Sequence, residues 1–498
     1  MRMSKRSVSG LILGTLTLAL APAGCGALLG LDDFTESAAT SGSGAGTGSG
    51  GGGGSGGATS TGTGGAAPCT TPADCPQPPA GSHAAATCIK GACNVLCDAG
   101  HDNCDDDFSS NGCEVDLETD AAHCGSCSNA CAVPKCSKHV CNNPVDVAAG
   151  VYHSCAVLLD QSVWCWGKNG NGELGDGTNI TRTKPVAILP PGSATKVVAG
   201  GDTTSPHTCA LMTSNEVRCW GGNAYGQLGI NSTQDKNTPQ LVALQSVTDI
   251  EVGGGHTCAI KNPESLYCWG SNSNGQLGNG VKGTNVLAPP SSSIASGVTQ
   301  VGLGGSHTCA TGDSAKCWGN VGFGRCGIDS FNDQLVPSTV SFGGSVVVSE
   351  FALGESHTCA MAGSALYCFG RNYEGEVGAN DTSTGSFVIP QLLTLTGVKS
   401  VSAGLARWSG AIAGADNAVY TWGNEKDECL GNGPGGSDAV YAPGKNGLTD
   451  VKRLSLGYLH ACALKLNGEL LCWGNNVFGE VGDGTTSPNR AVPTPVLW

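Results

Sequence analysis

The sequence of 498 residues is poor in the side chains that most nucleic-acid-binding proteins use. Charged residues make up 13% and aromatic residues 5%, and the formal net charge is −15. Binding to phosphate backbones needs clustered Lys and Arg, and no such cluster is present, so we expect no nucleic acid partner. Beyond residue 25, no apolar run is long enough to span a bilayer.

Linear catalytic motifs are also missing. The sequence has no His-Glu-x-x-His zinc motif and no phosphate-binding loop. It has no Gly-x-Ser-x-Gly elbow outside a glycine-rich stretch near the N-terminus. A catalytic site can still be assembled from distant segments, so these absences weaken an enzymatic role without excluding it. We therefore expect a protein that is not an enzyme and that needs no cofactor.

The first 25 residues have the pattern of an export signal. Three basic residues precede an apolar run, Leu11 to Leu20, that is too short to cross a membrane. The segment Ala23-Gly24-Cys25 resembles the end of a bacterial lipoprotein signal. The resemblance implies a signal peptide over 1–25, lipidation of Cys25, and a place in the bacterial outer membrane or on the cell surface. The alternative is ordinary cleavage nearby, which would give a periplasmic or secreted protein.

Two segments of unusual composition follow. Residues 26–67 are rich in Gly, Ser and Thr, cannot bury apolar surface, and are expected to form a flexible linker. Residues 68–144 contain twelve cysteines and few large apolar residues. Disulfides are expected to replace a hydrophobic core in this cysteine-rich module, although spacing alone leaves their connectivity open.

Metal binding in the module competes with the disulfide interpretation. Zinc bound through Cys124 and Cys127 is disfavoured, because thiols of an exported chain are oxidised. Calcium is a second candidate, since Ca²⁺ takes clustered carboxylates, although the order of residues departs from the EF-hand loop. A solvated acidic loop is the simpler interpretation of the same residues. The candidate calcium ligands are Asp102, Asp105, Asp106 and Asp107.

The dominant pattern is a unit of about fifty residues that recurs seven times in 145–498. Five copies carry Cys-Trp-Gly, as in Cys268-Trp269-Gly270. One copy has Cys368-Phe369-Gly370, and another has Thr421-Trp422-Gly423. Each unit also contains short β-favouring runs separated by turn residues, which predicts an all-β repeat protein.

Paired cysteines recur within the repeat. Six copies carry His-x-Cys followed 8–10 residues later by a second Cys, with turn residues between them. On a hairpin, Cys258 would lie opposite Cys268 with Cα atoms roughly 4.5–5.5 Å apart, as a disulfide requires. The remaining copy has Ser409 and Thr421 where the others have Cys, so both partners are lost together. The predicted bonds are Cys155–Cys165, Cys209–Cys219, Cys258–Cys268, Cys309–Cys317, Cys359–Cys368 and Cys462–Cys472.

The repeat resembles that of the regulator of chromosome condensation family. The resemblance is carried by the Gly-x-x-His-x-Cys-Ala opening, the Trp-Gly pair and the Asn-x-x-Gly-Gln-Leu-Gly turn of Asn223–Gly229 and Asn272–Gly278. It covers roughly 145–498 and implies a seven-bladed β-propeller, with cysteines similar to those of a secreted variant. Chromatin binding and nucleotide exchange on a small GTPase are not expected of an acidic, exported chain.

Two further side chains recur once per copy. The histidines could suggest metal ligands, and the tryptophans could suggest carbohydrate platforms. Their regular placement favours a buried, hydrogen-bonded histidine and a tryptophan packed between neighbouring blades instead. The histidines are His153, His207, His256, His307, His357 and His460, and the tryptophans are Trp166, Trp220, Trp269, Trp318, Trp422 and Trp473.

Positions that break the repeat are candidates for function. Arg407 and Trp408 stand in the copy that lacks the cysteine pair, and Trp and Arg are enriched at binding hot spots. We therefore list both as candidate partner contacts at a blade rim, with neutral drift as the alternative. Cys326 and Cys429 are left over from the hairpin scheme and are expected to be free thiols.

Together these patterns predict an exported, membrane-anchored scaffold that binds a protein or another cell-surface macromolecule through propeller loops. One rival is an extracellular enzyme or lectin with its site at the propeller axis, which converging carboxylates or aromatics would favour. A second rival is a structural or adhesive surface component, which would self-associate.

Overall fold

The computed structural model describes residues 69–78, 80–90, 92–102, 113, 115–124, 126–127, 130–131, 136–137, 140–344, 346–434 and 439–498. The predicted signal peptide with Cys25, the linker, and three of the candidate calcium ligands, Asp105, Asp106 and Asp107, lie outside these residues. Among the residues described, no helix is both long enough and apolar enough to cross a bilayer.

The cysteine-rich module consists of short elements joined by disulfides. The bonds between described residues are Cys69–Cys88, Cys75–Cys93, Cys97–Cys113, Cys124–Cys136 and Cys131–Cys141. Its elements are η1 (Pro72–Asp74), β1 (Ala84–Ile89), β2 (Ala92–Cys97), β3 (His101–Asp102), β4 (Val115–Asp116), β5 (Cys136–Ser137) and β6 (Val140–Cys141). The sheets have only two strands each, so the bonds hold elements that are too small to bury a core.

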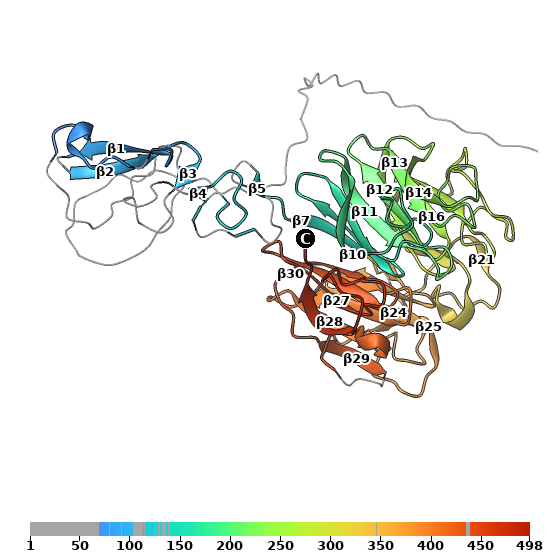
Figure 1. Ribbon diagram of the computed structural model, residues 1–498. Coiled ribbons are helices and arrows are strands. Elements are labelled where there is room, and N and C mark those ends of the chain that lie inside the picture. Colours follow the sequence, from blue (N-terminus) through green and yellow to red (C-terminus); the bar gives the residue numbers. More distant parts are fainter. Residues whose placement is uncertain are drawn as a thin grey trace, which may run out of the picture. The chain divides into compact units, whose positions relative to one another are not determined.

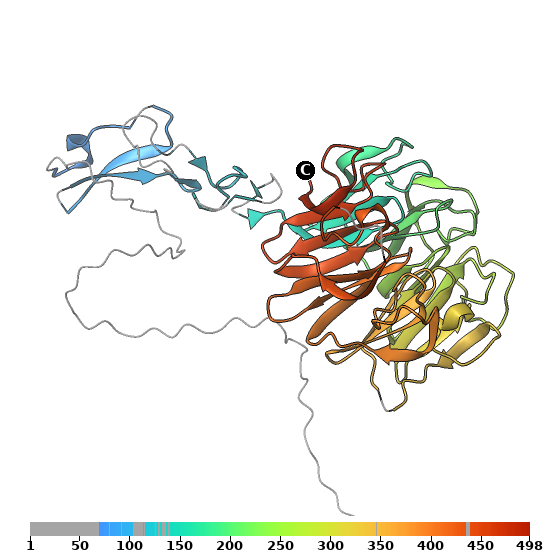
Figure 2. The same ribbon diagram turned by 90° about the horizontal axis from the view of Figure 1, so that it is seen from below.

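Residues 144–495 form seven antiparallel sheets arranged as the blades of a propeller (Figures 1 and 2). Blade 1 comprises β7 (Pro144–Ala149), β8 (His153–Leu158), β9 (Val163–Gly167) and β10 (Arg182–Leu189), and blade 2 comprises β11 (Ala194–Gly200), β12 (His207–Met212), β13 (Val217–Gly221) and β14 (Lys236–Leu241). Blade 3 comprises β15 (Val247–Val252), β16 (His256–Lys261) and β17 (Ser265–Gly270). Blade 4 comprises β18 (Val298–Leu303), β19 (His307–Gly312), β20 (Lys316–Gly319), η2 (Gly322–Gly324) and β21 (Gln334–Thr339). Blade 3 completes its sheet with two isolated bridges, Leu266 to Ala295 and Gly270 to Val286.

Blades 5 to 7 repeat the same order of strands. Blade 5 comprises β22 (Glu350–Leu353), β23 (His357–Ala362), β24 (Ala365–Arg371) and β25 (Ser386–Leu392). Blade 6 comprises β26 (Val398–Ala403), β27 (Trp408–Ala413), β28 (Ala418–Gly423), η3 (Lys426–Glu428) and β29 (Val440–Lys445). Blade 7 comprises β30 (Val451–Leu456), β31 (His460–Lys465), β32 (Leu470–Gly474) and β33 (Arg490–Pro495). The predicted all-β, seven-bladed propeller is confirmed.

The second and third strands of a blade form the predicted hairpin. In blade 3, Cys258 pairs with Cys268, Ala259 with Tyr267 and Ile260 with Leu266. All six expected disulfides are present in the structure, each with a Cα–Cα distance of 4.1 Å. Each bond therefore joins the two middle strands of its blade.

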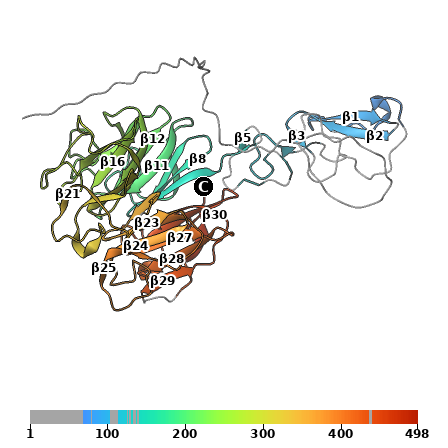
Figure 3. The ribbon, with the colours of Figure 1, turned by 180° about the vertical axis from the view of Figure 1, so that it is seen from behind.

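The ring closes between the first and last blades, where β7 packs against β30 and β31 (Figures 1 and 3). Each of these two blades is formed by its own continuous stretch of chain, with no strand exchanged between them, so closure depends on side-chain and loop contacts. Arg453 on β30 forms an ion pair with Asp146 on β7, and Ala149 N–H donates to Ser455 Oγ over 2.9 Å.

Candidate functional site

The recurring histidines hold neighbouring blades together. Each Nε2 lies 2.7–3.0 Å from a hydroxyl oxygen on the next blade, as in His256 to Thr308. That hydroxyl in turn donates to a turn carbonyl of the histidine's own blade, as Thr308 does to Gln276 at 2.8 Å. A hydroxyl has one proton, so each Nε2 must carry the hydrogen that reaches the hydroxyl oxygen. The bond pairs are His153–Thr208, His207–Thr257, His256–Thr308, His307–Thr358, His357–Ser409 and His460–Ser154.

These histidines are buried and neutral. Burial lowers the pKa of His153, His207, His256 and His357 to about 3 and that of His460 to about 4. The prediction of a repeated, buried, hydrogen-bonded histidine is confirmed, and the ring nitrogens are sequestered from solvent ligands.

The six tryptophans of the Trp-Gly pairs are also fully buried. Trp318 is typical: its Nε1 donates to Gln276 O of the preceding blade over 2.9 Å. Gly278 lies beneath the same ring at φ +70°, and a Cβ there would come within 2.7 Å of Trp318 Nε1. The Gly is therefore needed by the packing, the expected inter-blade role is confirmed, and these rings offer no carbohydrate platform.

The structure corrects two expectations for blade 6. Trp408 pairs with Gly423, which is the register of the histidine in other blades, and it is fully buried with Nε1 donating to Tyr458 O. The hypothesis that Trp408 contacts a partner is therefore wrong. Ser409 takes the threonine position, and it is Gly410 that faces Thr421 where other blades have two cysteines.

Arg407 lies at the surface, as expected for a rim residue. Its side chain is 46% exposed, and it forms ion pairs with Glu374 at 2.9 Å and Glu355 at 3.7 Å. It lines a cavity of about 330 Å³ with Tyr152 and Tyr458. The structure therefore leaves the side chain of Arg407 accessible, whereas that of Trp408 beside the same cavity is fully buried.

One face of the propeller is hollowed. It is built from the loops between first and second strands and from the longer loops between third and fourth strands, and we call it the long-loop face. A mouth cavity of about 680 Å³ lies there, lined by loops of blades 2 to 7 that include Tyr225, Phe323, Arg325, Glu355 and Tyr458. It shares Glu355 and Tyr458 with the cavity beside Arg407.

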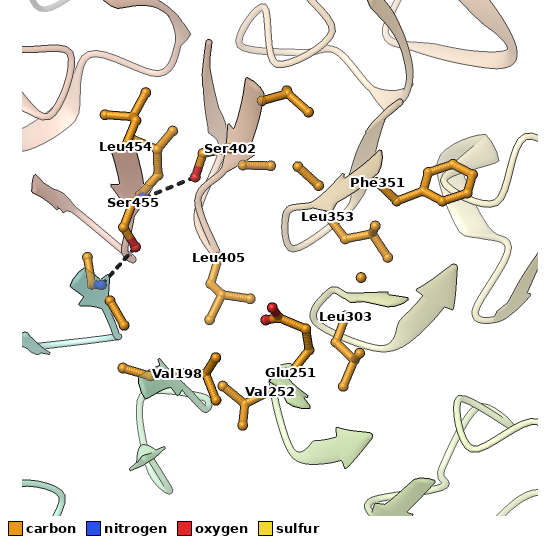
Figure 4. A pocket seen from close by; sticks show the side chains of 18 of the residues that line it. Val198, Glu251, Val252, Leu303, Phe351, Leu353, Ser402, Leu405, Leu454 and Ser455 are labelled. Carbon is orange, nitrogen blue, oxygen red and sulfur yellow. Dashed lines mark hydrogen bonds between the residues drawn. The ribbon is translucent and has the colours of Figure 1, made fainter. Parts of the chain in front are cut away.

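A smaller cavity of about 200 Å³ lies between the first strands of the blades (Figure 4). Glu251 and Leu405 point into it, and Leu405 also lines the mouth cavity. Lys196 Nζ lies 2.6 Å from Glu251 Oε1 and 2.7 Å from Asp249 Oδ1. Burial alone would lower the pKa of Lys196, but these two carboxylates outweigh burial and raise it.

Glu350 is the other carboxylate of this axial cavity. Burial raises its pKa to about 7, against a smaller opposing effect of Arg453. Carboxylates thus do converge at the axis, as the rival enzyme or lectin requires. Cations neutralise Asp146, Asp249 and Glu251, however, so most of the local negative charge is already used in holding the blades.

The cysteine sulfurs offer no open ligand set in the described part of the chain. The two cysteine groups close enough to hold a metal consist of disulfide-bonded residues, and Cys124 and Cys127 are both bonded. Cys326 and Cys429 are free and buried, and burial raises the pKa of each thiol, to about 12 for Cys326.

Phe323 and Arg325 were missed by the sequence reasoning. Arg325 stands where blades 2 and 3 have Gln227 and Gln276, and Phe323 stands where blade 3 has Asn274. The sequence does mark this position, because the Gly-Gln-Leu-Gly turn of blades 2 and 3 is interrupted in blade 4.

Comparison with known proteins gives a consistent result. A family model described as an RCC1-like domain matches residues 116–446, and one described as a regulator of chromosome condensation (RCC1) repeat matches residues 451–480. The ultraviolet-B receptor UVR8 of Arabidopsis thaliana is 30% identical over 352 residues, which are 68% of this chain and 78% of UVR8. The human E3 ubiquitin-protein ligase HERC2 is 29% identical over 343 residues, which are 66% of this chain but 7% of HERC2.

Solved structures show the same fold. Saccharomyces cerevisiae Prp20p matches with a TM-score of 0.56 and 22% identity, covering 71% of this chain and 86% of that one. Human WBSCR16 matches with a TM-score of 0.55 and 19% identity, covering 66% of this chain and 88% of that one.

Proposed function

The chain belongs to the RCC1-like domain family, and from this premise we propose that it is an exported, membrane-anchored scaffold that binds a protein partner through its long-loop face. One contrast carries the proposal. The histidines and tryptophans that define the repeat are buried in contacts between blades, and its paired cysteines are bonded within a blade, whereas the long-loop face carries irregular aromatic and charged side chains around two cavities. Concave surfaces lined in this way are typical of binding sites.

The relatives support a binding role. One structure of Prp20p was reported with the binding properties of the protein to Gsp1p and histones, and another shows yeast RCC1 (Prp20) bound to Kap60. Ligase activity belongs to HERC2 as a whole, and this chain spans 7% of that protein. We therefore propose binding without catalysis, and an acidic protein with net charge −15 is not suited to nucleic acid.

The binding proposal is tested by capturing partners with the full-length, tagged chain extracted from its own membranes. Tyr373→Ser removes an aromatic ring that is 58% exposed on the long-loop face. Leu466→Ser, at a residue 60% exposed in the hairpin between β31 and β32, is the matched control on the opposite face. The proposal expects the partner to be lost with Tyr373→Ser and kept with Leu466→Ser, and the reverse result contradicts it.

The anchor is tested separately. Lipidation of Cys25 would place the mature protein in the detergent phase, and Cys25→Ser would release it or stall its processing. Calcium binding by the cysteine-rich module through Asp102 and its acidic neighbours remains a minor proposal. A calcium titration followed by calorimetry on the full chain, with and without Asp102→Asn, would decide it.

A further inference from the structure

Arg325 is the only Lys or Arg that is buried in the described part of the chain, with 6% of its surface exposed. The other described arginines each have a carboxylate within ion-pair distance, except Arg218, which is only partly buried. Arg325 has no such partner in the described residues, yet it lines the mouth cavity. Glu355 and Asp333 act on its charge only from beyond ion-pair distance, and a buried charge without an ion pair is costly, so this position requires an explanation.

The arginine also breaks a structural rule of the repeat. At the equivalent position, Gln227 accepts the backbone N–H of Tyr225, and Gln276 accepts that of Asn274, both at 2.9 Å. A guanidinium has no acceptor, so Arg325 cannot close its own turn in this way. The turn instead passes through Phe323 at φ 61°, a conformation that is unfavourable for a bulky side chain.

Hydrogen bonds hold the guanidinium in place. Its Nε donates to Gly322 O at 2.9 Å, and its Nη1 donates to Glu355 O at 3.0 Å and Ser306 Oγ at 3.3 Å. Its Nη2 makes no hydrogen bond to the described residues. The group is therefore fixed across blades 4 and 5, and Nη2 with its two N–H groups is left for a ligand.

One exposed aromatic ring lies beside the guanidinium, and a second lies against the first. The guanidinium carbon of Arg325 is 5.7 Å from the centre of the Phe323 ring, and the Phe323 ring meets Tyr373 edge to face at 6.1 Å. Phe323 is 45% exposed and Tyr373 58% exposed. A guanidinium without an ion pair among the described residues thus adjoins an aromatic rim.

We propose that Arg325 binds the side-chain carboxylate of an Asp or Glu from a partner protein, and that an apolar side chain next to it covers Phe323 and Tyr373. This inference rests on the proposed protein-binding function and names the chemistry of the partner. An arginine with a free donor and a rigid orientation is well suited to a single carboxylate, because a charge-assisted hydrogen bond is shorter and stronger than a neutral one.

The surroundings argue against a polyanion. Asp202 and Glu355 also line the mouth cavity, and Glu355 is 50% exposed, so a phosphate-rich ligand would meet several like charges in the same cavity. One guanidinium can match one carboxylate, whereas nucleic acid requires several cations. The occupant is therefore a protein segment that brings one negative charge and an apolar neighbour.

The test uses an array of nine-residue peptides with blocked ends, in which an Asp or Glu stands beside Phe or Leu. Each peptide has a counterpart with Asn or Gln in place of the acid. The full-length protein should prefer the acidic member of the best-binding pairs by about tenfold or more, as expected for a charge-assisted bond. Arg325→Gln installs the residue of blades 2 and 3, so it should keep its melting temperature within about 2 °C and lose the preference.

Three controls make the outcome decisive. Arg325→Lys should retain only part of the preference, because an ammonium group cannot reproduce the fork geometry. Peptides whose only negative charge is a free C-terminal carboxylate should bind no better than the blocked amide peptides. Absence of binding by the whole array, a preference that survives Arg325→Gln, or selective binding of the free C-terminus overturns the inference.

The outcome is separable from that of the proposed function. If the natural partner is lost with Tyr373→Ser but kept undiminished with Arg325→Gln, the long-loop face binds protein and Arg325 is not its carboxylate site. If no partner depends on either variant, the proposed function itself fails.

Discussion

A single carboxyl group, that of Glu425, should make the propeller lose stability as the pH rises. Glu425 lies two residues after Gly423. At the position equivalent to Glu425, blades 1, 2, 3, 5 and 7 have asparagine. In blade 2 this asparagine, Asn223, donates to Ser232 O at 2.8 Å and Gln234 O at 3.0 Å, and it accepts the backbone N–H of Leu228 at 3.0 Å. The position therefore requires both a donor and an acceptor.

A carboxylate cannot supply the donor. Glu425 is 3% exposed, its Oε1 has no hydrogen-bond partner in the described residues, and its Oε2 accepts only a long bond of 3.4 Å from Asn432. Burial, together with the nearby Glu428, raises the pKa of Glu425 to about 7 from an ordinary value near 4.5. Below pH 7 the folded protein keeps a proton that the unfolded chain has already lost above pH 4.5.

The direction in which folding stability changes with pH follows from the number of protons bound by the folded and unfolded states. Because the folded state binds more protons in this window, the stabilising contribution is complete below about pH 4.5 and is lost as the pH rises through about 7. The pKa difference corresponds to about 3 kcal/mol as an upper limit. We expect this loss to lower the melting temperature by roughly 2–5 °C between pH 5 and pH 8.

Glu425→Asn restores the residue of the other blades and removes the titration. The melting temperatures of wild type and variant should nearly agree at pH 5, and the variant should melt higher by those few degrees at pH 8. Glu350 and Glu480, whose pKa values are also raised to about 7, titrate in both proteins and cancel in the difference. Asp313→Asn, at an exposed hairpin position, controls for the loss of one charge. Parallel melting curves for wild type and Glu425→Asn from pH 5 to pH 8 would refute the reasoning.

Three further outcomes are expected. Non-reducing peptide mapping should recover the six hairpin disulfides, each contributing roughly 2–3 kcal/mol, and reduction should lower the melting temperature sharply; free thiols at these sites in exported protein would contradict the pairing. Cys326 and Cys429 should resist a thiol reagent in the native protein and react once it is unfolded, since burial raises the pKa of both. Trp408→His should destabilise the folded propeller by about 2–4 kcal/mol, because it leaves a cavity and an unpaired imidazole. Adding Ala461→Thr, which supplies the missing hydroxyl on blade 7, should recover part of that loss. Simple additivity of the two substitutions in a double-mutant cycle would argue against a compensated contact between blades 6 and 7.

The sequence was sufficient for the blades, because the repeat marks every contact that recurs. A tryptophan after a strand cysteine and a histidine two residues before the other cysteine each return at a fixed place. Only packing that is repeated around a ring explains such regularity. Their burial and the cysteine register could therefore be read from one copy and transferred to the others.

Blade 6 shows where spacing fails. Its loop between β26 and β27 has one residue more than that of blade 3, because Gly404 is followed by Trp408 four residues later where Gly253 is followed by His256 three residues later, and this extra residue shifts the apparent alignment of the next strand. Ser409 therefore looked like the lost cysteine, and Trp408 looked like a rim residue. Arg325 was missed for a different reason: its burial and its unpaired charge are set by loops of two blades, which no single repeat displays.

The seam between blades 6 and 7 shows which irregularities bear on function. Trp408 replaces the histidine on one side, and Ala461 replaces the hydroxyl residue on the other, so donor and acceptor are absent together and the ring fills the gap. A departure that the next blade compensates in this way serves packing. Arg325 is different, because no described residue forms an ion pair with it and its free N–H groups lie at a cavity beside exposed aromatic rings. By this criterion the partner is to be sought at blades 4 and 5, where the departure from the repeat leaves a charge unsatisfied, and not at the blade that departs from the repeat most.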